Sequence, residues 1–196
     1  MTEKPTESIQ PKSILEWNKW LERNHSRANG IWLITFKQAT GRPRIFYDDA
    51  VESALCFGWI DSKPRTLDAE RSMLWFSPRK KGSAWSKRNK ERVEKLVAAN
   101  RLHEAGLAKI EEAKQDGSWI KLDSVEALEI PSDLRKAFKS NLGSNSNFDA
   151  FPRSTKRAIL EWIGNAKTEA TRAKRVSETA TLAAENIRAN QWTKKK

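Results

Sequence analysis

The order of apolar patterns along the chain is the feature that most limits its fold. Up to residue 78, short stretches rich in β-branched and aromatic residues predict strands at 31–37, 59–67 and 72–78. From about Ser83 onward, helical spacing dominates, with predicted helices at 83–100, 104–117, 154–167 and 168–189. This order predicts an α+β protein: a small antiparallel sheet with packed helices, followed by a helical C-terminal part.

Three further helices are predicted from their end signals. Ser13 with Glu16 three residues later forms a capping-box pattern at the start of a helix over 13–25. A second helix over 48–57 begins at Asp48 or Asp49 and ends at Gly58, which can adopt the left-handed conformation of a helix stop. A third begins near Pro131, and the stretch 143–147 reads as a turn.

Nine tryptophans in 196 residues indicate that much of the core is indole. Cys56 is the single cysteine, so no internal disulfide can form and burial of apolar surface has to stabilise the fold. Cys56 lies in an apolar helix between Leu55 and Phe57, which predicts a buried, unreactive thiol.

The patterns divide the chain into four segments. We expect a flexible tail over 1–13, an α+β domain over 14–125, a helical segment over 126–192 packed on it, and a basic tail over 193–196. No stretch approaches eighteen consecutive apolar residues, so no transmembrane segment is expected. The polar N-terminus lacks the apolar run of a signal peptide, which favours a cytoplasmic location.

The net charge of +12 is unevenly distributed. Residues 71–101 carry ten basic and two acidic side chains, and residues 153–196 carry eleven basic and four acidic ones. The segment between them, 102–152, has six basic and nine acidic side chains. Two basic blocks separated by an acidic one predict an anionic partner, although solvated helix faces would give the same composition.

The stretch WFSPRKKGSAWSKRNK, residues 75–90, concentrates this charge, with six Lys or Arg and no acid. A helix that begins near Ser83 or Ser86 would gather cations at its positively polarised end, where an anion would be favoured. Arg88, Arg92 and Lys95 would extend the site as a basic stripe, while Trp85 and Val97 would face the core. The predicted anion-binding residues, including two from the C-terminal block that would have to converge on it, are Arg79, Lys80, Lys81, Ser83, Ser86, Lys87, Arg88, Arg172 and Arg175.

Three classes of function remain open on these residues. The first is a non-enzymatic protein that binds a phosphate-bearing ligand, a nucleic acid or an acidic protein surface. The second is a nucleic-acid-associated protein, because basic blocks with interleaved Trp suit phosphate contact and base stacking. The third is an enzyme on an acidic small molecule, with Arg79, Lys87 and Asp61 in a pocket. The candidates for pocket residues are Trp59, Asp61 and Trp85.

Signatures of known catalytic and metal sites are missing from the sequence. It contains no Gly-rich phosphate loop and no nucleophile elbow. One Cys and two His cannot build an ordinary structural zinc site. We therefore assign no catalytic residue, no metal ligand and no cofactor, and the oligomeric state stays open.

Three long motifs in order resemble those of the YdeI/OmpD-associated proteins, also called bacteriocin-protection proteins. They are ALCFGWIDSK (54–63), FSPRKKGSAWSKRNKERVEKL (76–96) with AGLAKIEEAKQDGSW (105–119), and WIGNAKTEATRAKRV (162–176). The resemblance covers roughly residues 14–190. It departs at Asn100, Arg101 and Leu102, where family members often have Gly-Arg-Met.

The resemblance implies an N-terminal α+β part related in outline to the small YjbR/CyaY-like folds, and a helical C-terminal part. It also implies a role in stress or in resistance to antimicrobial peptides. Periplasmic residence, suggested for some members, is not expected here without an export signal. The family supplies no established catalytic residue to transfer to this chain.

Overall fold

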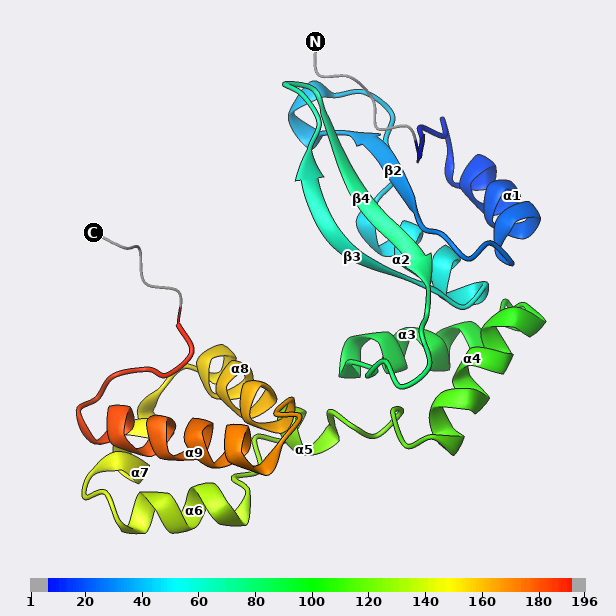
Figure 1. Ribbon diagram of the computed structural model, residues 1–196. Helices are drawn as coiled ribbons and strands as arrows, with labels where there is room; N and C mark the ends of the chain where they lie inside the picture. The colour runs from blue at the N-terminus through cyan, green and yellow to red at the C-terminus, as the bar shows by residue number, and fades with distance from the viewer. Residues whose placement is uncertain (1–6, 192–196) are drawn as a thin grey trace. The chain divides into compact units, whose positions relative to one another are not determined.

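The computed structural model describes residues 7–191, and the chain divides into two compact units, 1–121 (unit 1) and 122–196 (unit 2). The architecture is α+β, with a four-stranded sheet and four α-helices described in unit 1 and helices in unit 2 (Figure 1). The boundary predicted after residue 125 falls inside the first helix of unit 2, α5 (Asp123–Glu126).

The sheet of unit 1 has the strand order β1-β2-β4-β3. The strands are β1 (Ser8–Ile9), β2 (Ile31–Phe36), β3 (Trp59–Thr66) and β4 (Arg71–Pro78). β2 and β3 both pair antiparallel with β4, which confirms the predicted pairing of 59–67 with 72–78. A register shift between Asp61 and Pro64 interrupts the β3–β4 ladder.

The sheet extends further toward the N-terminus than the sequence indicated. Ser8 and Ile9, in the segment expected to be a flexible tail, form β1 and pair parallel with Trp32 and Leu33 of β2. The open edge of β2 offers backbone hydrogen-bonding groups to any extended neighbour, so a strand can form there without an apolar pattern of its own. The basic tail predicted at 193–196 lies outside the described residues.

Helices pack against one face of the sheet in unit 1, where α2 lies behind β3 and β4 in Figure 1. They are α1 (Ile14–Asn24) and α2 (Tyr47–Cys56), whereas α3 (Lys87–Ala98) and α4 (Glu104–Gln115) pack against α2. A short 3-10 helix, η1 (Gln38–Thr40), follows β2. The Ser13 hydroxyl accepts a hydrogen bond from the Glu16 N–H at 3.3 Å, so the predicted cap of the first helix is confirmed. The second helix begins earlier than predicted, after Phe46, and no side chain caps it.

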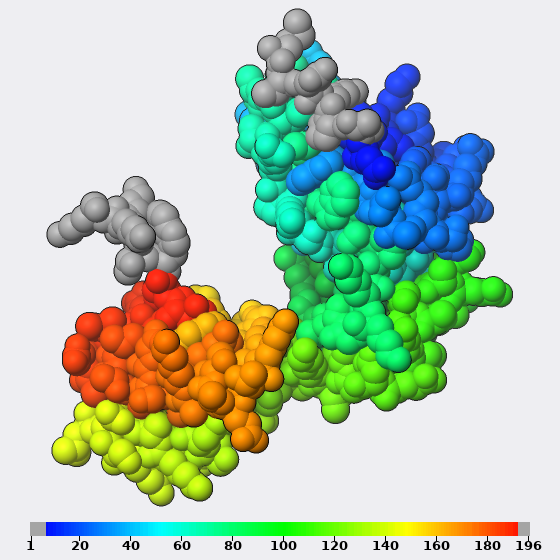
Figure 2. Space-filling model, viewed as in Figure 1, coloured from blue at the N-terminus to red at the C-terminus, as the bar shows by residue number. Residues whose placement is uncertain are grey.

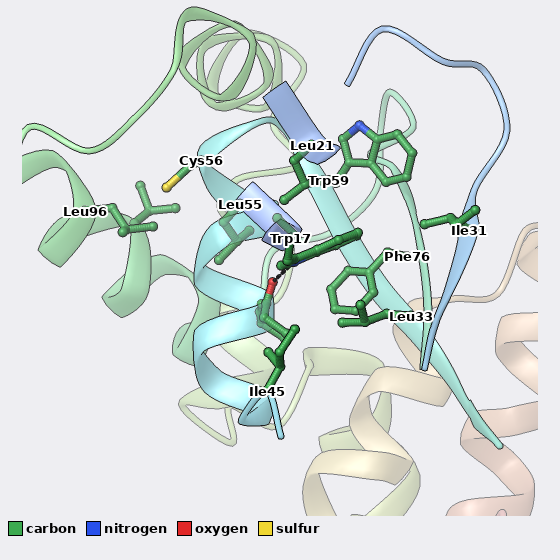
Figure 3. Close-up of a cluster of buried hydrophobic side chains, with 14 of the residues drawn as sticks. Trp17, Leu21, Ile31, Leu33, Ile45, Leu55, Cys56, Trp59, Phe76 and Leu96 are labelled. Atoms are coloured by element: carbon green, nitrogen blue, oxygen red, sulfur yellow. Dashed lines mark hydrogen bonds between the residues drawn. The ribbon is translucent and has the colours of Figure 1, made fainter. Parts of the chain in front are cut away.

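The core of unit 1 is built around buried tryptophans (Figure 3). Trp17 stacks on Trp20 at 5.3 Å between ring centroids, and its indole N–H donates to the Ala50 carbonyl at 3.2 Å. Trp59 is fully buried and donates its indole N–H to the His25 carbonyl at 2.9 Å. The indole N–H groups of Trp17 and Trp59 thus both have a hydrogen-bond partner, as large aromatic donors in a core require.

Close backbone approach joins α4 to the end of α2. A Cβ on Gly106 would lie 2.3 Å from the carbonyl oxygen of Cys56, so only glycine fits there. Gly58 has the positive φ of 76° predicted for the residue that stops the second helix.

Unit 2 is helical over its described residues. After α5 come α6 (Ser132–Lys139), α7 (Ser144–Ala150), α8 (Arg153–Gly164) and α9 (Glu169–Ala184). Pro131 precedes α6 directly, close to its predicted place. The segment 143–147, predicted as a turn, instead opens α7, because Phe148 is buried against Phe138 and Phe151 and tertiary packing outweighs the low helix propensity of Ser and Asn.

Candidate ligand-binding cleft

The basic stretch does not form an open cluster of cations. Arg79 is only 5% exposed, and its guanidinium carbon lies 3.6 Å from the centroid of the Trp85 ring. Its Nη2 donates to the Ala84 carbonyl at 2.9 Å, whereas its buried Nε has no partner within residues 7–191. Burial lowers the pKa of Arg79 to about 10, against the opposing effect of the Asp61 charge, so the side chain is still protonated at neutral pH.

The helix that follows begins at Lys87, with Ser86 as its cap. The Ser86 hydroxyl accepts from the Asn89 N–H at 3.3 Å, so this hydroxyl already has a role within the fold. Arg88 forms an ion pair with Asp48 at 2.8 Å, and Lys87 lies 4.0 Å from Glu91. Lys80 and Lys81 are exposed, and Ser83 is half-buried.

Two predictions for this helix are wrong. Arg92 was expected in an exposed basic stripe, and Val97 was expected to face the core. Arg92 is buried, where it donates to Asp48 and, at 2.7 Å, to the side chain of Asn89. Val97 is 55% exposed. The reason is that α3 turns the Arg92 position toward the start of α2, where the acid Asp48 compensates the buried charge.

The two arginines of the C-terminal block are held within unit 2. Arg172 makes a bidentate pair with Asp133, at 2.7 and 3.1 Å. Arg175 lies over the Trp162 ring at 4.9 Å and donates to the Trp162 carbonyl. In Figure 2 the face of unit 2 toward the viewer is formed mostly by α9 (orange) above α6 and α7 (yellow-green). The convergence of these arginines with residues 79–88 stays a prediction.

The cavity beside Arg79 is too small for a ligand. It is lined by residues including Lys80, Gly82, Trp85 and Asp116, and its volume is about 10 Å³. That volume corresponds to roughly one water molecule at most.

A much larger cleft, of about 750 Å³, opens on the helix-covered face of the sheet near the start of α2. Clefts of roughly 300–1,000 Å³ are the usual size for small-molecule sites. The cleft lies where the strands extend past the helices that cover the rest of this face. Its lining consists of Leu33, Thr35, Phe36, Lys37, Gln38, Arg44, Ile45, Tyr47, Ala50, Asp61, Ser62, Pro64, Arg65, Thr66, Ser72, Met73 and Leu74.

The floor of the cleft is ordered by strand register. Thr35 pairs with Ser72, and Ser72 pairs with Thr66, so three hydroxyl side chains form one line across the sheet, the hydroxyl row. A second line of side chains, the apolar row, lies two residues away along each strand and consists of Leu33, Leu74 and Pro64. Side chains two apart on a strand share a face, so both rows belong to the floor.

The register shift in β3 brings Asp61 to the same face. Asp61 pairs with Phe76, whereas Pro64 pairs with Leu74, so two residues of β3 stand opposite Trp75 alone. Without this bulge, Asp61 and Pro64, three residues apart, would point to opposite faces. The bulge therefore adds a carboxylate to the cleft beyond the apolar row.

Tyr47 and Asp61 form a hydrogen bond at the edge of the cleft. The Tyr47 hydroxyl donates to the Asp61 carboxylate at 2.9 Å. Burial raises the pKa of Tyr47, and the Asp61 carboxylate raises it further, while the charges of Arg92 and Arg88 oppose the rise. Tyr47 is therefore a neutral O–H donor at physiological pH, and Asp61 keeps its second oxygen for another donor.

Two cationic side chains, Lys37 and Arg44, line the cleft near the hydroxyl row, at the end opposite Asp61. Lys37 continues the line of β2 beyond Thr35, and its ammonium group donates to the carbonyls of Asp68 at 2.7 Å and Ala69 at 3.2 Å. Arg44 lies over the Phe46 ring at 4.7 Å. Neither has an ion-pair partner in the part of the chain that the structure describes. Arg65 pairs with Met73, whose side chain packs with Ile34 on the other face, so its side chain belongs to that face.

Of the three predicted pocket residues, Asp61 lines this cleft, and Trp59 and Trp85 do not. Trp59 and Trp85 are buried in the core, at 0% and 2% exposure. Sequence reasoning missed Tyr47, Lys37, Arg44 and the hydroxyl row. The available signal was the alternation of Leu33, Thr35 and Lys37 along β2, which changes from apolar to polar on one face.

Family models match both units. A model described as bacteriocin-protection, YdeI or OmpD-associated matches residues 127–186, and a model of a domain of unknown function (DUF8412) matches residues 9–109. The chain therefore belongs to the DUF8412 family, and its residues 127–186 are similar to the YdeI/OmpD-associated family. No curated protein and no solved structure matches it.

Each of the two family models matches a different unit of the chain. The YdeI/OmpD-associated match spans α6 to α9, including Arg172 and Arg175. The DUF8412 match spans every residue of the cleft. Neither match connects unit 1 with the YjbR/CyaY-like folds, so that relation stays a prediction.

The described part of the chain contains neither a candidate metal site nor a membrane-spanning helix. Within residues 7–191, no group of three or more His, Cys, Asp or Glu side chains could hold a metal ion. None of the helices described there is long and apolar enough to span a bilayer.

Proposed function

We propose that this protein belongs to the YdeI/OmpD-associated family and is a non-enzymatic, basic binding protein whose cleft takes an organic anion. The observation that carries the proposal is the composition of the cleft. Its floor has an apolar row for a hydrocarbon or aromatic body. Next to it lie a hydroxyl row and two cations that have no ion-pair partner among residues 7–191. A ligand site of this kind, largely apolar with a few convergent polar groups, holds its ligand by burial and orients it by the polar groups.

The charges near the hydroxyl row favour a carboxylate, sulfonate or phosphate as the polar end of the ligand. Lys37 has three ammonium donors, of which two contact backbone carbonyls, so one can reach an anion. Ser72 and Thr66 can donate their hydroxyl hydrogens to the same anion. Hydrogen bonds between charged partners are roughly twice as strong as neutral ones.

Binding of decanoate to the full chain tests the proposal. Decanoate has a single carboxylate and an apolar chain, and amide chemical shifts locate its contact. We expect shifts at Thr35, Ser72 and Thr66, and about tenfold weaker binding to the Lys37→Gln/Arg44→Gln variant. The matched control is Lys80→Gln/Lys95→Gln, which removes the same charge from exposed positions outside the cleft.

Two results would overturn the proposal. In one, decanoate shifts no amide of the cleft. In the other, the control variant loses as much affinity as the cleft variant, which would assign the attraction to net charge alone.

The exposed lysines of the basic stretch support a second, weaker contact with a polyanion such as nucleic acid. Lys80, Lys81 and Lys87 are exposed, and the stretch 75–90 that contains them has no acid. Flexible, exposed lysines suit the non-specific contact that a phosphate backbone makes.

The description of the family associates it with bacteriocin protection, and we extend that role to this chain. If ligand binding in the cleft serves protection, the Lys37→Gln/Arg44→Gln variant should fail to restore bacteriocin resistance to a host that lacks the gene, whereas Lys80→Gln/Lys95→Gln should restore it. Equal rescue by both variants would separate the cleft from that role.

A further inference from the structure

Polarity changes in one direction along the floor of the cleft. Lys37 lies at one end, followed by the hydroxyl row and then the apolar row. Asp61, opposite Phe76, comes one step beyond the apolar row. The four steps are successive positions on one face of the sheet, so the cleft has a cationic end and an acidic end separated by apolar surface.

The acidic end can bind a donor. One carboxylate oxygen of Asp61 accepts the Tyr47 hydroxyl at 2.9 Å, and no residue in 7–191 forms an ion pair with Asp61. A carboxylate accepts about four hydrogen bonds, so Asp61 has capacity for an ammonium group. The hydrogen bond from the neutral Tyr47 hydroxyl holds the Asp61 carboxylate in position and leaves its negative charge uncompensated by that bond.

The register sets the length that a ligand needs to reach both ends. From Ser72 in the hydroxyl row to Phe76 opposite Asp61 there are four residues on β4. At about 3.3 Å per residue, the two ends lie roughly 13 Å apart. The middle of such a ligand would cover Leu33, Leu74 and Pro64.

We propose that the cleft selects elongated zwitterions, with the anion at Lys37 and the hydroxyl row, the apolar body over the apolar row, and an amine at Asp61. This deepens the proposed function and rests on it, since it requires that the cleft bind organic anions at all. The ligand class is a molecule with an acid and an amine at opposite ends of an apolar body.

A pair of probes that differ only in the amine tests this selectivity. The full chain is titrated with ω-aminodecanoate and with decanoate, and binding is measured by calorimetry and by amide chemical shifts. We expect ω-aminodecanoate to bind about tenfold more tightly than decanoate. The Asp61→Asn variant should lose this preference and bind the two probes with affinities within about twofold of each other, because asparagine can still accept the Tyr47 hydroxyl but has no charge for the ammonium group. The shorter ω-aminobutyrate cannot span both ends and should bind no more tightly than butyrate.

Each outcome separates the two proposals. If decanoate binds in the cleft as tightly as ω-aminodecanoate, or if Asp61→Asn keeps the preference for the amine, the zwitterion proposal is wrong and the anion proposal stands. If neither probe shifts the cleft amides, both proposals fail. A preference for ω-aminobutyrate over butyrate equal to that for the long pair would show that the spacing of the two ends does not matter, and would also overturn the inference.

Discussion

The guanidinium of Arg79 is stacked on Trp85, with 3.6 Å between its central carbon and the ring centroid. The residue with the strongest claim to anion binding in the sequence is thus a core residue. An Arg over an indole, shielded from water, gains roughly 2 kcal/mol from the cation–π interaction, and its stem fills space as an apolar side chain does. The charge itself is costly there, which is why burial lowers the pKa of Arg79.

Substitution of Arg79 should separate packing from charge. Arg79→Ala removes the atoms that cover Trp85 and should destabilise unit 1 by about 2–4 kcal/mol. Arg79→Met keeps most of the volume and removes the desolvation cost, so its unfolding free energy should stay within about 1.5 kcal/mol of wild type. Urea unfolding followed by Trp fluorescence measures both. Equal losses in the two variants would show that the charge, and not the packing, stabilises this site.

The core tryptophans give the second prediction. Trp59→Ala and Trp85→Ala should each cost about 3–5 kcal/mol in unfolding free energy, because both rings are buried. Val97→Ala, at a position 55% exposed on α3, is the control and should cost less than about 1 kcal/mol. Thermal melting of the three variants tests this, and a wild-type-like melt of either Trp variant would contradict it.

Cys56 should be inert in the folded protein. Burial raises the pKa of its thiol, Glu52 raises it further, and the charge of Arg101 opposes the rise, so the reactive thiolate is disfavoured at neutral pH. We expect alkylation by iodoacetamide only as fast as the protein opens, with full labelling in urea. In Gly106→Ala, whose added methyl would meet the Cys56 carbonyl at 2.3 Å, labelling should be faster. Rapid labelling of the wild type would show that the thiol is accessible and reactive in the folded protein.

Strand and helix patterns predicted the fold class of this chain well, because its strands and helices have clear periods. Ile31, Leu33 and Phe76 could be assigned to a core face from alternation alone. The place of Asp61 in the cleft could not be predicted, because it depends on the register of the bulge between Asp61 and Pro64. Pro64 indicates an irregular strand there, but it does not fix which face Asp61 takes. The anion site at residues 79–88 stays a prediction, but nothing in the sequence reveals that Asp48, on a distant helix, forms ion pairs with Arg88 and Arg92.

The exposed lysines predict how a polyanion binds. Affinity for a short duplex DNA should fall steeply with salt, because bound counterions are released. Lys80→Gln/Lys81→Gln should lower the magnitude of the slope of log affinity against log salt by roughly 2, one unit per lost phosphate contact. The matched control, Lys136→Gln/Lys139→Gln, removes two exposed lysines from α6 and should leave the slope unchanged. Identical slopes in all three proteins would show that Lys80 and Lys81 are solvated surface without a phosphate contact.

Unit 2 should become less stable in acid, because protonation of Asp133 weakens its ion pair with Arg172. The hydrogen bond from Arg172 lowers the pKa of Asp133, the N–H of Leu134 lowers it further, and burial opposes both. A carboxyl group whose pKa is lower in the folded state stabilises the fold above its unfolded pKa of about 3.8, and this stabilisation disappears as pH falls through the folded value. Asp133→Asn should therefore destabilise unit 2 at pH 7, and the difference from wild type should shrink below about pH 4.

Urea unfolding, followed through the amide signals of α6 and α9 at pH 7 and at pH 3, measures this difference. Glu129→Gln is the matched control, since it removes one exposed acid of unit 2 from a position just before α6. Its effect on unfolding should be small at pH 7, within about 0.5 kcal/mol. If Asp133→Asn costs the same at both pH values, the contribution comes from hydrogen bonds that asparagine cannot replace, and not from the charge of the Arg172–Asp133 pair.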